Sequence, residues 1–145
     1  MSIVYFDSSA FVKLIVDEDG SELAAALWDG ADAAVSSRVA YPEVCAALAA
    51  AQRARRLGRR GHRRAVGAWD RFWAAVRRVE LTESVAEHAG SLAAEHALGG
   101  ADAIHLASLF AVGGDTTMFA VRDQRLRTGA HACGVRLAPR EAGTG

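Results

Sequence analysis

Short apolar runs alternate with helix-forming segments along this chain, and this alternation constrains the fold more than any other feature. Ser2–Asp7 is an apolar, β-branched and aromatic run of the kind found in buried strands. Further strands are predicted over Ala33–Ser37, 79–81, Thr117–Arg122 and Val135–Ala138. Strands separated by helices pair in parallel, and the helices cover both faces of the sheet. The pattern therefore predicts an α/β domain with a parallel sheet of four to five strands.

Residues with helical and capping preferences fill the segments between these strands. Pro42 suits the first turn of a helix, and Thr82 suits an N-cap. Glycine pairs at 99–100 and 113–114 interrupt the later helices. We predict helices over residues 8–16, 21–28, 42–57, 63–79, 82–98, 101–112 and 124–130.

The length of 145 residues suits one domain with a single core. We predict that residues 1–138 form this domain and that 139–145 form a C-terminal tail. No apolar run approaches the roughly 18–20 residues that span a bilayer. The first residues lack the basic and apolar regions of a signal peptide, so a cytoplasmic location is expected. Cys45 and Cys133 are expected to be thiols that behave as small hydrophobic side chains.

Charge is unevenly distributed, although the formal net charge is zero. Residues 53–78 contain ten arginines and one acid, Asp70, whereas the rest of the chain holds 7 basic and 16 acidic residues. A solvated helix face normally mixes charges of both signs, and this segment does not. We therefore interpret it as a surface for phosphate groups or for a protein partner, with a simple solvated face as the alternative.

Four acids follow strands or open helices at the same predicted edge of the sheet. Asp7 ends the first strand, and Asp123 follows the strand that starts at Thr117. Glu43 lies in the first turn of the helix after the second strand, and Asp102 opens a later helix. Sites in open α/β sheets lie outside the carboxyl ends of the strands. These four side chains are therefore candidates for one site.

Each acid also has an ordinary structural role open to it. Asp is favoured at helix N-caps, and Glu in a first turn interacts well with the helix dipole. Taken together the acids favour a metal site, because carboxylates beside apolar strands are costly to bury and most arginines lie elsewhere. Mg²⁺ or Mn²⁺ would neutralise such a cluster through oxygen ligands. A metal held in this way activates water beside a phosphate, which predicts hydrolysis of phosphodiester bonds.

Four segments also have the residues and the order of a known set of motifs. They read VYFDSSAFVKL at 4–14, YPEVCAAL at 41–48, ADAIHLAS at 101–108 and FAVRDQRL at 119–126. In this order and spacing, which covers nearly the whole chain, they resemble the PIN domain and, within it, the VapC-type toxins of bacterial toxin–antitoxin pairs. The resemblance implies a PIN-like three-layer α/β/α sandwich around the parallel sheet.

The same resemblance implies a site, an activity and partners. The acids that it assigns to the metal site are Asp7, Glu43, Asp102 and Asp123. Ser9 matches a common Ser or Thr that hydrogen-bonds a carboxylate or a metal-bound water. The implied protein is an endoribonuclease that depends on Mg²⁺ or Mn²⁺, cleaves single-stranded or structured RNA, forms homodimers and binds an inhibitory antitoxin. Many relatives carry Ser or Thr just before the last acid, whereas Val121 and Arg122 stand there in this chain.

Three further side chains have two interpretations each. His105 shares a helix face with Asp102, and we predict a supporting role rather than a general base, because a metal can activate water itself. Trp69 and Trp73 are spaced as core or interface residues rather than as stacking platforms for bases. Their apolar stripe is expected to bury against the first helices, a second copy or an antitoxin. It comprises Trp69, Phe72, Trp73 and Val76.

Other protein classes fit the residues less well or stay open. A haloacid-dehalogenase-type phosphatase would place a second Asp where Ser9 stands, and a receiver domain would place a lysine late in the chain, which has only Lys13. Two alternatives remain. One is a PIN nuclease of RNA maturation without an antitoxin, and the other is a non-catalytic RNA-binding or regulatory module of the same fold.

Overall fold

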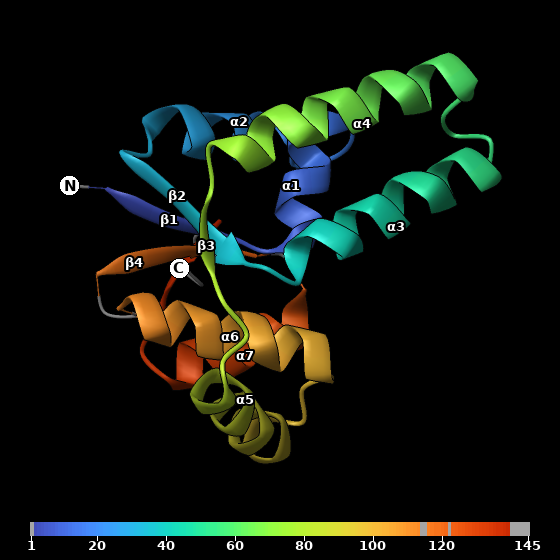
Figure 1. Ribbon diagram of the computed structural model, residues 1–145. Helices are drawn as coiled ribbons and strands as arrows, with labels where there is room; N and C mark the ends of the chain where they lie inside the picture. Colours follow the sequence, from blue (N-terminus) through green and yellow to red (C-terminus); the bar gives the residue numbers. More distant parts are fainter. Residues whose placement is uncertain (1, 114–115, 122, 140–145) are drawn as a thin grey trace, which may run out of the picture.

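Five parallel strands form the centre of the molecule, in the order β3-β2-β1-β4-β5 (Figure 1). The computed structural model describes residues 2–113, 116–121 and 123–139. The strands are β1 (Ile3–Phe6), β2 (Ala33–Ser37), β3 (Arg77–Val79), β4 (Thr117–Ala120) and β5 (Arg136–Ala138). This sheet confirms the predicted fold class. Arg122, expected in the fourth strand, and the predicted tail beyond Pro139 lie outside the described residues, and the domain boundary at 138 stays a prediction.

Helices cover both faces of the sheet, which gives the three layers that were expected (Figure 1). The helices on one face are α1 (Ser8–Ile15), α2 (Ser21–Gly30), α3 (Ala40–Arg53) and α4 (Arg59–Ala74). Those on the other face are α5 (Glu83–His96), α6 (Gly100–Val112) and α7 (Gln124–Ala132). Successive side chains of a strand point to opposite faces, so Val4 and Phe6 of β1 enter the core under α1–α4 and Tyr5 enters the core under α5–α7.

The apolar stripe on α4 packs inside its own chain. Trp69 is fully buried, and its ring lies 4.9 Å from the ring of Phe11 in α1. Phe72 meets Trp28 of α2 edge to face at 5.0 Å. Of the three coverings that the sequence left open, the first helices of the same chain account for these side chains. The burial of Trp69 and Trp73 also confirms that they are core residues.

Differences from the predicted boundaries concentrate in the arginine-rich segment. α4 begins at Arg59, although the sequence predicted a break through Gly61 and a start at residue 63. Gly61 is the third residue of the helix, where the greater backbone freedom of glycine costs at most about 1 kcal/mol relative to alanine. The helix ends at Ala74 rather than near Val79, because the backbone of Arg77–Val79 pairs instead with β2.

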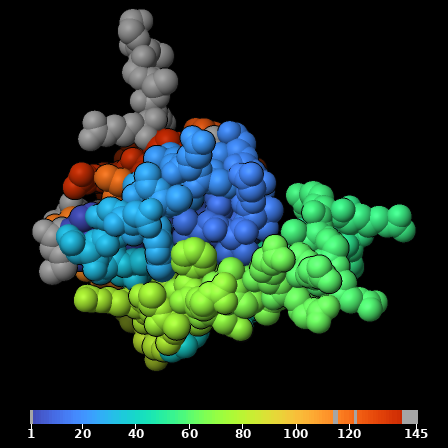
Figure 2. Space-filling model, turned by 90° about the horizontal axis from the view of Figure 1, so that it is seen from above, coloured from blue at the N-terminus to red at the C-terminus, as the bar shows by residue number. Residues whose placement is uncertain are grey.

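α3 and α4 form an antiparallel hairpin whose tip stands out from the rest of the molecule (Figure 2). α3 ends at Arg53, short of the predicted residue 57. A tight turn follows, in which Arg55 has a φ of 60° and the amides of Arg56 and Leu57 donate to the carbonyl of Ala51. The part of the chain that the structure describes contains no helix that is both long and apolar enough to cross a membrane. Cys45 and Cys133 are free thiols, as predicted.

Candidate active site

Asp7 lies directly after the central strand and caps the first helix. Its Oδ1 accepts a hydrogen bond from the amide of Ala10 at 3.0 Å and another from the hydroxyl of Ser9 at 2.9 Å. The residue is only 5% exposed. Asp7 is therefore a helix cap, as one interpretation held, and Ser9 makes the carboxylate contact that the resemblance implied; a metal-binding role for Asp7 stays a prediction.

Glu43, in the first turn of α3, reaches across the end of the sheet to His105 of α6. Their Oε1 and Nε2 atoms lie 2.6 Å apart, and His105 is 1% exposed. The other ring nitrogen, Nδ1, lies 2.8 Å from the hydroxyl of Tyr5. The carboxylate of Glu43 can only accept, so Nε2 carries a proton, and in the neutral imidazole Nδ1 then accepts from the Tyr5 hydroxyl, which itself accepts from the amide of Ser37 at 3.0 Å.

Asp102 and Asp123 complete the group on the side of β4. Asp102 lies in the first turn of α6, two residues beyond its start, and is not the cap of that helix. Asp123 caps α7, and its Oδ1 accepts a hydrogen bond from the amide of Leu126 at 3.0 Å. All four acids thus stand at elements that meet at the carboxyl end of the sheet, as the sequence predicted.

The pKa of Asp102 depends on the charges of the neighbouring acids. Burial raises its pKa above the ordinary aspartate value, and the negative charges of Asp123 and Glu43 raise it further, against the opposing effect of His105. Burial also raises the pKa of Asp7, and the charge of Asp102 adds to the rise. The electrostatic effect of His105 and the hydrogen bonds from Ala10 and Ser9 lower the pKa of Asp7 but do not cancel this rise.

The four carboxylates are neighbours without forming a closed ligand set. Among residues 2–113, 116–121 and 123–139, no three His, Cys, Asp or Glu side chains come close enough to hold an ion as they stand. Three of the acids already have hydrogen-bond partners in the protein: Asp7 has Ser9 and Ala10, Glu43 has His105, and Asp123 has the amide of Leu126. Among the same residues, the only contact of any of the four acids with a basic side chain within 4.0 Å is that of Glu43 with His105, which is an ion pair only when the imidazole is protonated. These hard oxygen donors, with the pKa values of Asp7 and Asp102 raised by burial and by neighbouring negative charge, suit a divalent cation, which would supply the missing positive charge.

Tyr5 is the residue of this site that sequence reasoning missed. Its side chain points to the same face of the sheet as that of Asp7, two residues further along the chain. Its hydroxyl is hydrogen-bonded to Nδ1 of His105. The period of two along the strand could have placed it beside Asp7. Its contact with His105 joins residues 100 positions apart, and no local pattern predicts that.

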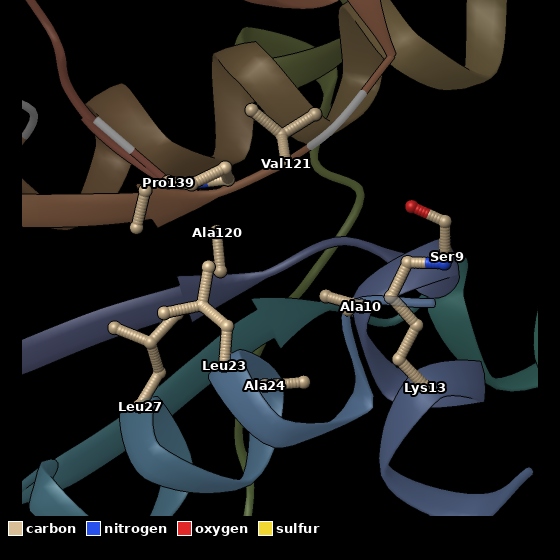
Figure 3. A pocket seen from close by; sticks show the side chains of 11 residues that line it. Ser9, Ala10, Lys13, Leu23, Ala24, Leu27, Ala120, Val121 and Pro139 are labelled. Carbon is tan, nitrogen blue, oxygen red and sulfur yellow. The ribbon is translucent and has the colours of Figure 1, made fainter. Parts of the chain in front are cut away.

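Two hollows flank the acids and differ in what they can hold. An open cleft of about 710 Å³ is lined by Asp102 and Asp123 together with Gln124, Arg125 and Thr128 of α7. Figure 3 shows a second pocket, where Leu23 and Leu27 of α2 face Ala120 and Pro139. This pocket is apolar and about 20 Å³ in size, enough for one water-sized group. Ligand sites usually occupy roughly 300–1,000 Å³, so of these two hollows the cleft beside the acids is the one large enough for a nucleotide.

Comparison with known families gives one match over most of the chain. The model of the PIN domain matches residues 4–129, a range that contains all four acids and Ser9. Two curated relatives from Mycobacterium tuberculosis are each 61% identical over 139 residues and cover 96% of both chains. They are ribonuclease VapC45 of strain CDC 1551 / Oshkosh and ribonuclease VapC49 of strain ATCC 25618 / H37Rv.

Solved structures with the same fold are more distant in sequence. Mycobacterium tuberculosis VapC20, described as a Sarcin-Ricin loop cleaving toxin, aligns with a TM-score of 0.66 at 22% identity, over 92% of this chain and 96% of that one. VapBC2 from Rickettsia felis, solved bound to a DNA fragment from its promoter, aligns with a TM-score of 0.64 at 11% identity, over 93% and 96% of the two chains. At these identities the likeness concerns the fold.

Proposed function

Because this chain belongs to the PIN-domain family, and within it to the VapC ribonucleases, we propose that it is a metal-dependent endoribonuclease that hydrolyses RNA phosphodiester bonds. The observation that supports this most directly is the group of four carboxylates at the carboxyl end of the sheet, beside an open cleft, where burial and the neighbouring negative charges raise the pKa values of Asp7 and Asp102. A cluster of carboxylates that repel one another does not stabilise a fold by itself, whereas a metal ion bound by such a cluster can assist phosphoryl chemistry.

The metal we propose is Mg²⁺ or Mn²⁺, and its ligands would be Asp7, Glu43, Asp102 and Asp123. These supply oxygen donors of the kind that hard divalent cations bind. When bound, such an ion activates water and offsets negative charge on the phosphate that is attacked.

The surrounding side chains hold these carboxylates in place. Ser9 and the Ala10 amide both bind Oδ1 of Asp7 and leave Oδ2 for a ligand. His105 binds Oε1 of Glu43, and Tyr5 fixes the orientation of the imidazole from its other side. We assign His105 the role of a positioning residue, because both of its ring nitrogens are already engaged within the protein.

The test is a cleavage assay on total cellular RNA with Mg²⁺ or Mn²⁺ and with chelator, in which the cut ends are mapped. Cleavage should require the metal and should disappear in Asp7→Asn and Asp102→Asn. Undiminished cutting in excess EDTA would refute the metal mechanism. Metal-independent RNA binding without any cleavage would favour the alternative of a non-catalytic module.

We further propose that the chain is the toxin of a toxin–antitoxin pair and acts as a homodimer. The solved structures of similar fold include a toxin–antitoxin complex from Klebsiella pneumoniae, with a TM-score of 0.58 at 18% identity. A small protein encoded by an overlapping upstream reading frame should bind the chain and stop cleavage. If no such frame exists, the RNA-maturation alternative gains support. Light scattering should give the mass of a dimer. The cytoplasmic location of the protein stays a prediction.

A further inference from the structure

The arginine-rich segment divides into two groups in the folded chain. Arg78 is used internally: it donates to the carbonyl of Trp73 at 2.7 Å, and its guanidinium lies 5.1 Å above the indole ring. Arg71 and Arg77 lie away from the hairpin tip, on the last turn of α4 and on the edge strand β3. The other seven gather at the tip of the α3–α4 hairpin, and we call them the tip arginines. They are Arg53, Arg55, Arg56, Arg59, Arg60, Arg63 and Arg64.

The side chains of the tip arginines have no polar partners in the described part of the protein. All seven are exposed, and within the residues that the structure describes none of them has an ion pair or a side-chain hydrogen bond. Four lie in the first six residues of α4, at the positive end of the helix dipole. Two pairs, Arg59 with Arg63 and Arg60 with Arg64, are spaced one turn apart and repel each other. Stability alone therefore disfavours this arrangement, which indicates an external anion.

The composition of the tip favours the phosphates of RNA over a protein as that anion. Leu57 is half-buried, and among the described residues the exposed large apolar side chains are Leu23 and Leu81, neither of which belongs to the hairpin tip. A protein interface is usually anchored by buried aromatic or aliphatic side chains. A nucleic-acid backbone needs only guanidinium groups, each able to bind a phosphate through two hydrogen bonds.

The hairpin itself sets how far this surface lies from the acids. Glu43 lies in the first turn of α3 at the site and Arg53 ends the helix at the tip, so ten residues at 1.5 Å each give a separation of about 15 Å along the helix. Along a stacked strand with about 3.4 Å of rise per nucleotide, this corresponds to roughly four to five nucleotides. α3 thus runs from the acids at one end to the tip arginines at the other.

From this geometry we propose that the tip arginines form a second RNA-binding site, which holds phosphates about four to five nucleotides from the bond that is cut. The proposal rests on the proposed function and narrows its substrate class. The substrate is an RNA long enough, or folded so, that it reaches both the acids and the hairpin tip. Short oligonucleotides around the cut site would engage the acids alone.

The experiment compares two substrates once the cut site has been mapped on cellular RNA. The short one carries about two nucleotides on each side of the cut bond, and the long one carries about twelve. The ratio of kcat/KM for the long substrate to that for the short substrate is measured at several salt concentrations. The variant is Arg60→Gln/Arg64→Gln, and the matched control is Arg77→Gln/Arg136→Gln, which removes two exposed arginines near the amino ends of β3 and β5.

We expect the parent and the control to prefer the long substrate and the tip variant to lose most of that preference. The slope of log affinity against log salt for the long RNA should fall by about 0.7 for each lost phosphate contact, or about 1.4 in the double variant. Equal ratios in all three proteins, with both substrates cut, would overturn the second site and leave the nuclease standing. Failure of the parent to cut either substrate refutes the proposed function instead. Polyglutamate serves as a probe for an acidic protein partner. If the tip variant keeps the parent's ratio of kcat/KM values but no longer binds polyglutamate, the tip arginines bind an acidic protein instead of RNA.

Discussion

The sheet edge and the hairpin tip both concentrate charge of one sign, but the fold treats them in opposite ways. At the sheet edge Asp7 is nearly buried and Glu43 is held by an imidazole, so particular protein atoms fix these carboxylates. At the tip the arginines are exposed and contact nothing that would orient them. A buried charge held by hydrogen bonds has a defined position, whereas exposed side chains without partners contribute mainly through their summed charge. Function at the edge should therefore depend on single atoms, and function at the tip should depend on the number of charges.

The largest expected effect follows from changing one atom at the edge. Asp102→Asn keeps the shape of the side chain but removes the charge that lies among the other acids. Loss of several kcal/mol of metal binding and charge stabilisation should lower kcat by about three orders of magnitude. Steady-state cleavage of a labelled RNA with Mn²⁺ measures this. The control is Glu87→Gln, at an exposed position of α5, which should cut normally, and equal rates in both variants would break the comparison.

A smaller effect should come from the residue behind the acids. Tyr5→Phe removes the hydroxyl that binds both the Ser37 amide and Nδ1 of His105. Supporting hydrogen bonds of this kind are worth about 10- to 100-fold in activity, and the unpaired buried groups cost about 1–3 kcal/mol of stability. We expect kcat to fall while KM changes little. Tyr41→Phe, which loses only a bond to Asp70, is the control. Restoration of the parent kcat at saturating metal would mean that Tyr5 acts through metal affinity alone.

A third effect concerns stability, where removing charge at the edge should help. The raised pKa of Asp7 means that the folded chain keeps this proton to a higher pH than the unfolded chain does. Parent stability in EDTA should therefore fall as the pH rises from about 4 through the raised pKa. Asp7→Asn does not titrate, and its amide oxygen can still accept from Ser9 and Ala10.

Melting curves in EDTA across this pH range measure the difference. Asp7→Asn should melt above the parent, by a margin that grows with pH and then becomes constant. Mn²⁺ should reverse the order, because a ligand at a hundredfold excess over its Kd stabilises the parent by about 2.7 kcal/mol and should bind the variant less. Identical melting temperatures, with and without Mn²⁺, would reduce Asp7 to a helix cap.

Local patterns predicted the parts of the molecule that depend on local physics. The strand alternation gave the class of fold, and residues at strand ends and helix starts, such as Asp7 and Glu43, could be assigned to one edge. The boundaries of α4 were wrong because one glycine costs a helix only about 1 kcal/mol and does not have to end it, and because β3 forms by pairing with distant β2. The contact between Tyr5 and His105 could not be predicted, since only the completed fold brings them together.

The separation of the arginine-rich segment was also beyond the sequence. Ten arginines within 26 positions indicated one basic surface, but the helix end at Ala74 sends Arg77 and Arg78 into the sheet layer, away from the hairpin tip. Charge composition gives a total for a segment, and only the path of the backbone decides which charges share a surface.

The smallest expected effect sharpens the comparison from the other side. Arg60→Gln/Arg64→Gln removes one like-charge pair on α4 and part of the positive charge at its dipole end, while Gln keeps a helix propensity close to that of Arg. Relief of such a pair is worth about 0.2–0.5 kcal/mol, so thermal melting at low salt should rise by a degree or so. The gain should disappear in high salt, because screening already weakens the repulsion between exposed charges. At the edge, in contrast, the gain from Asp7→Asn should persist in salt, since buried charges are screened much less. A lower melting temperature for the tip variant would show that these arginines have partners within the fold, and the distinction between fixed and unpartnered charge would then fail.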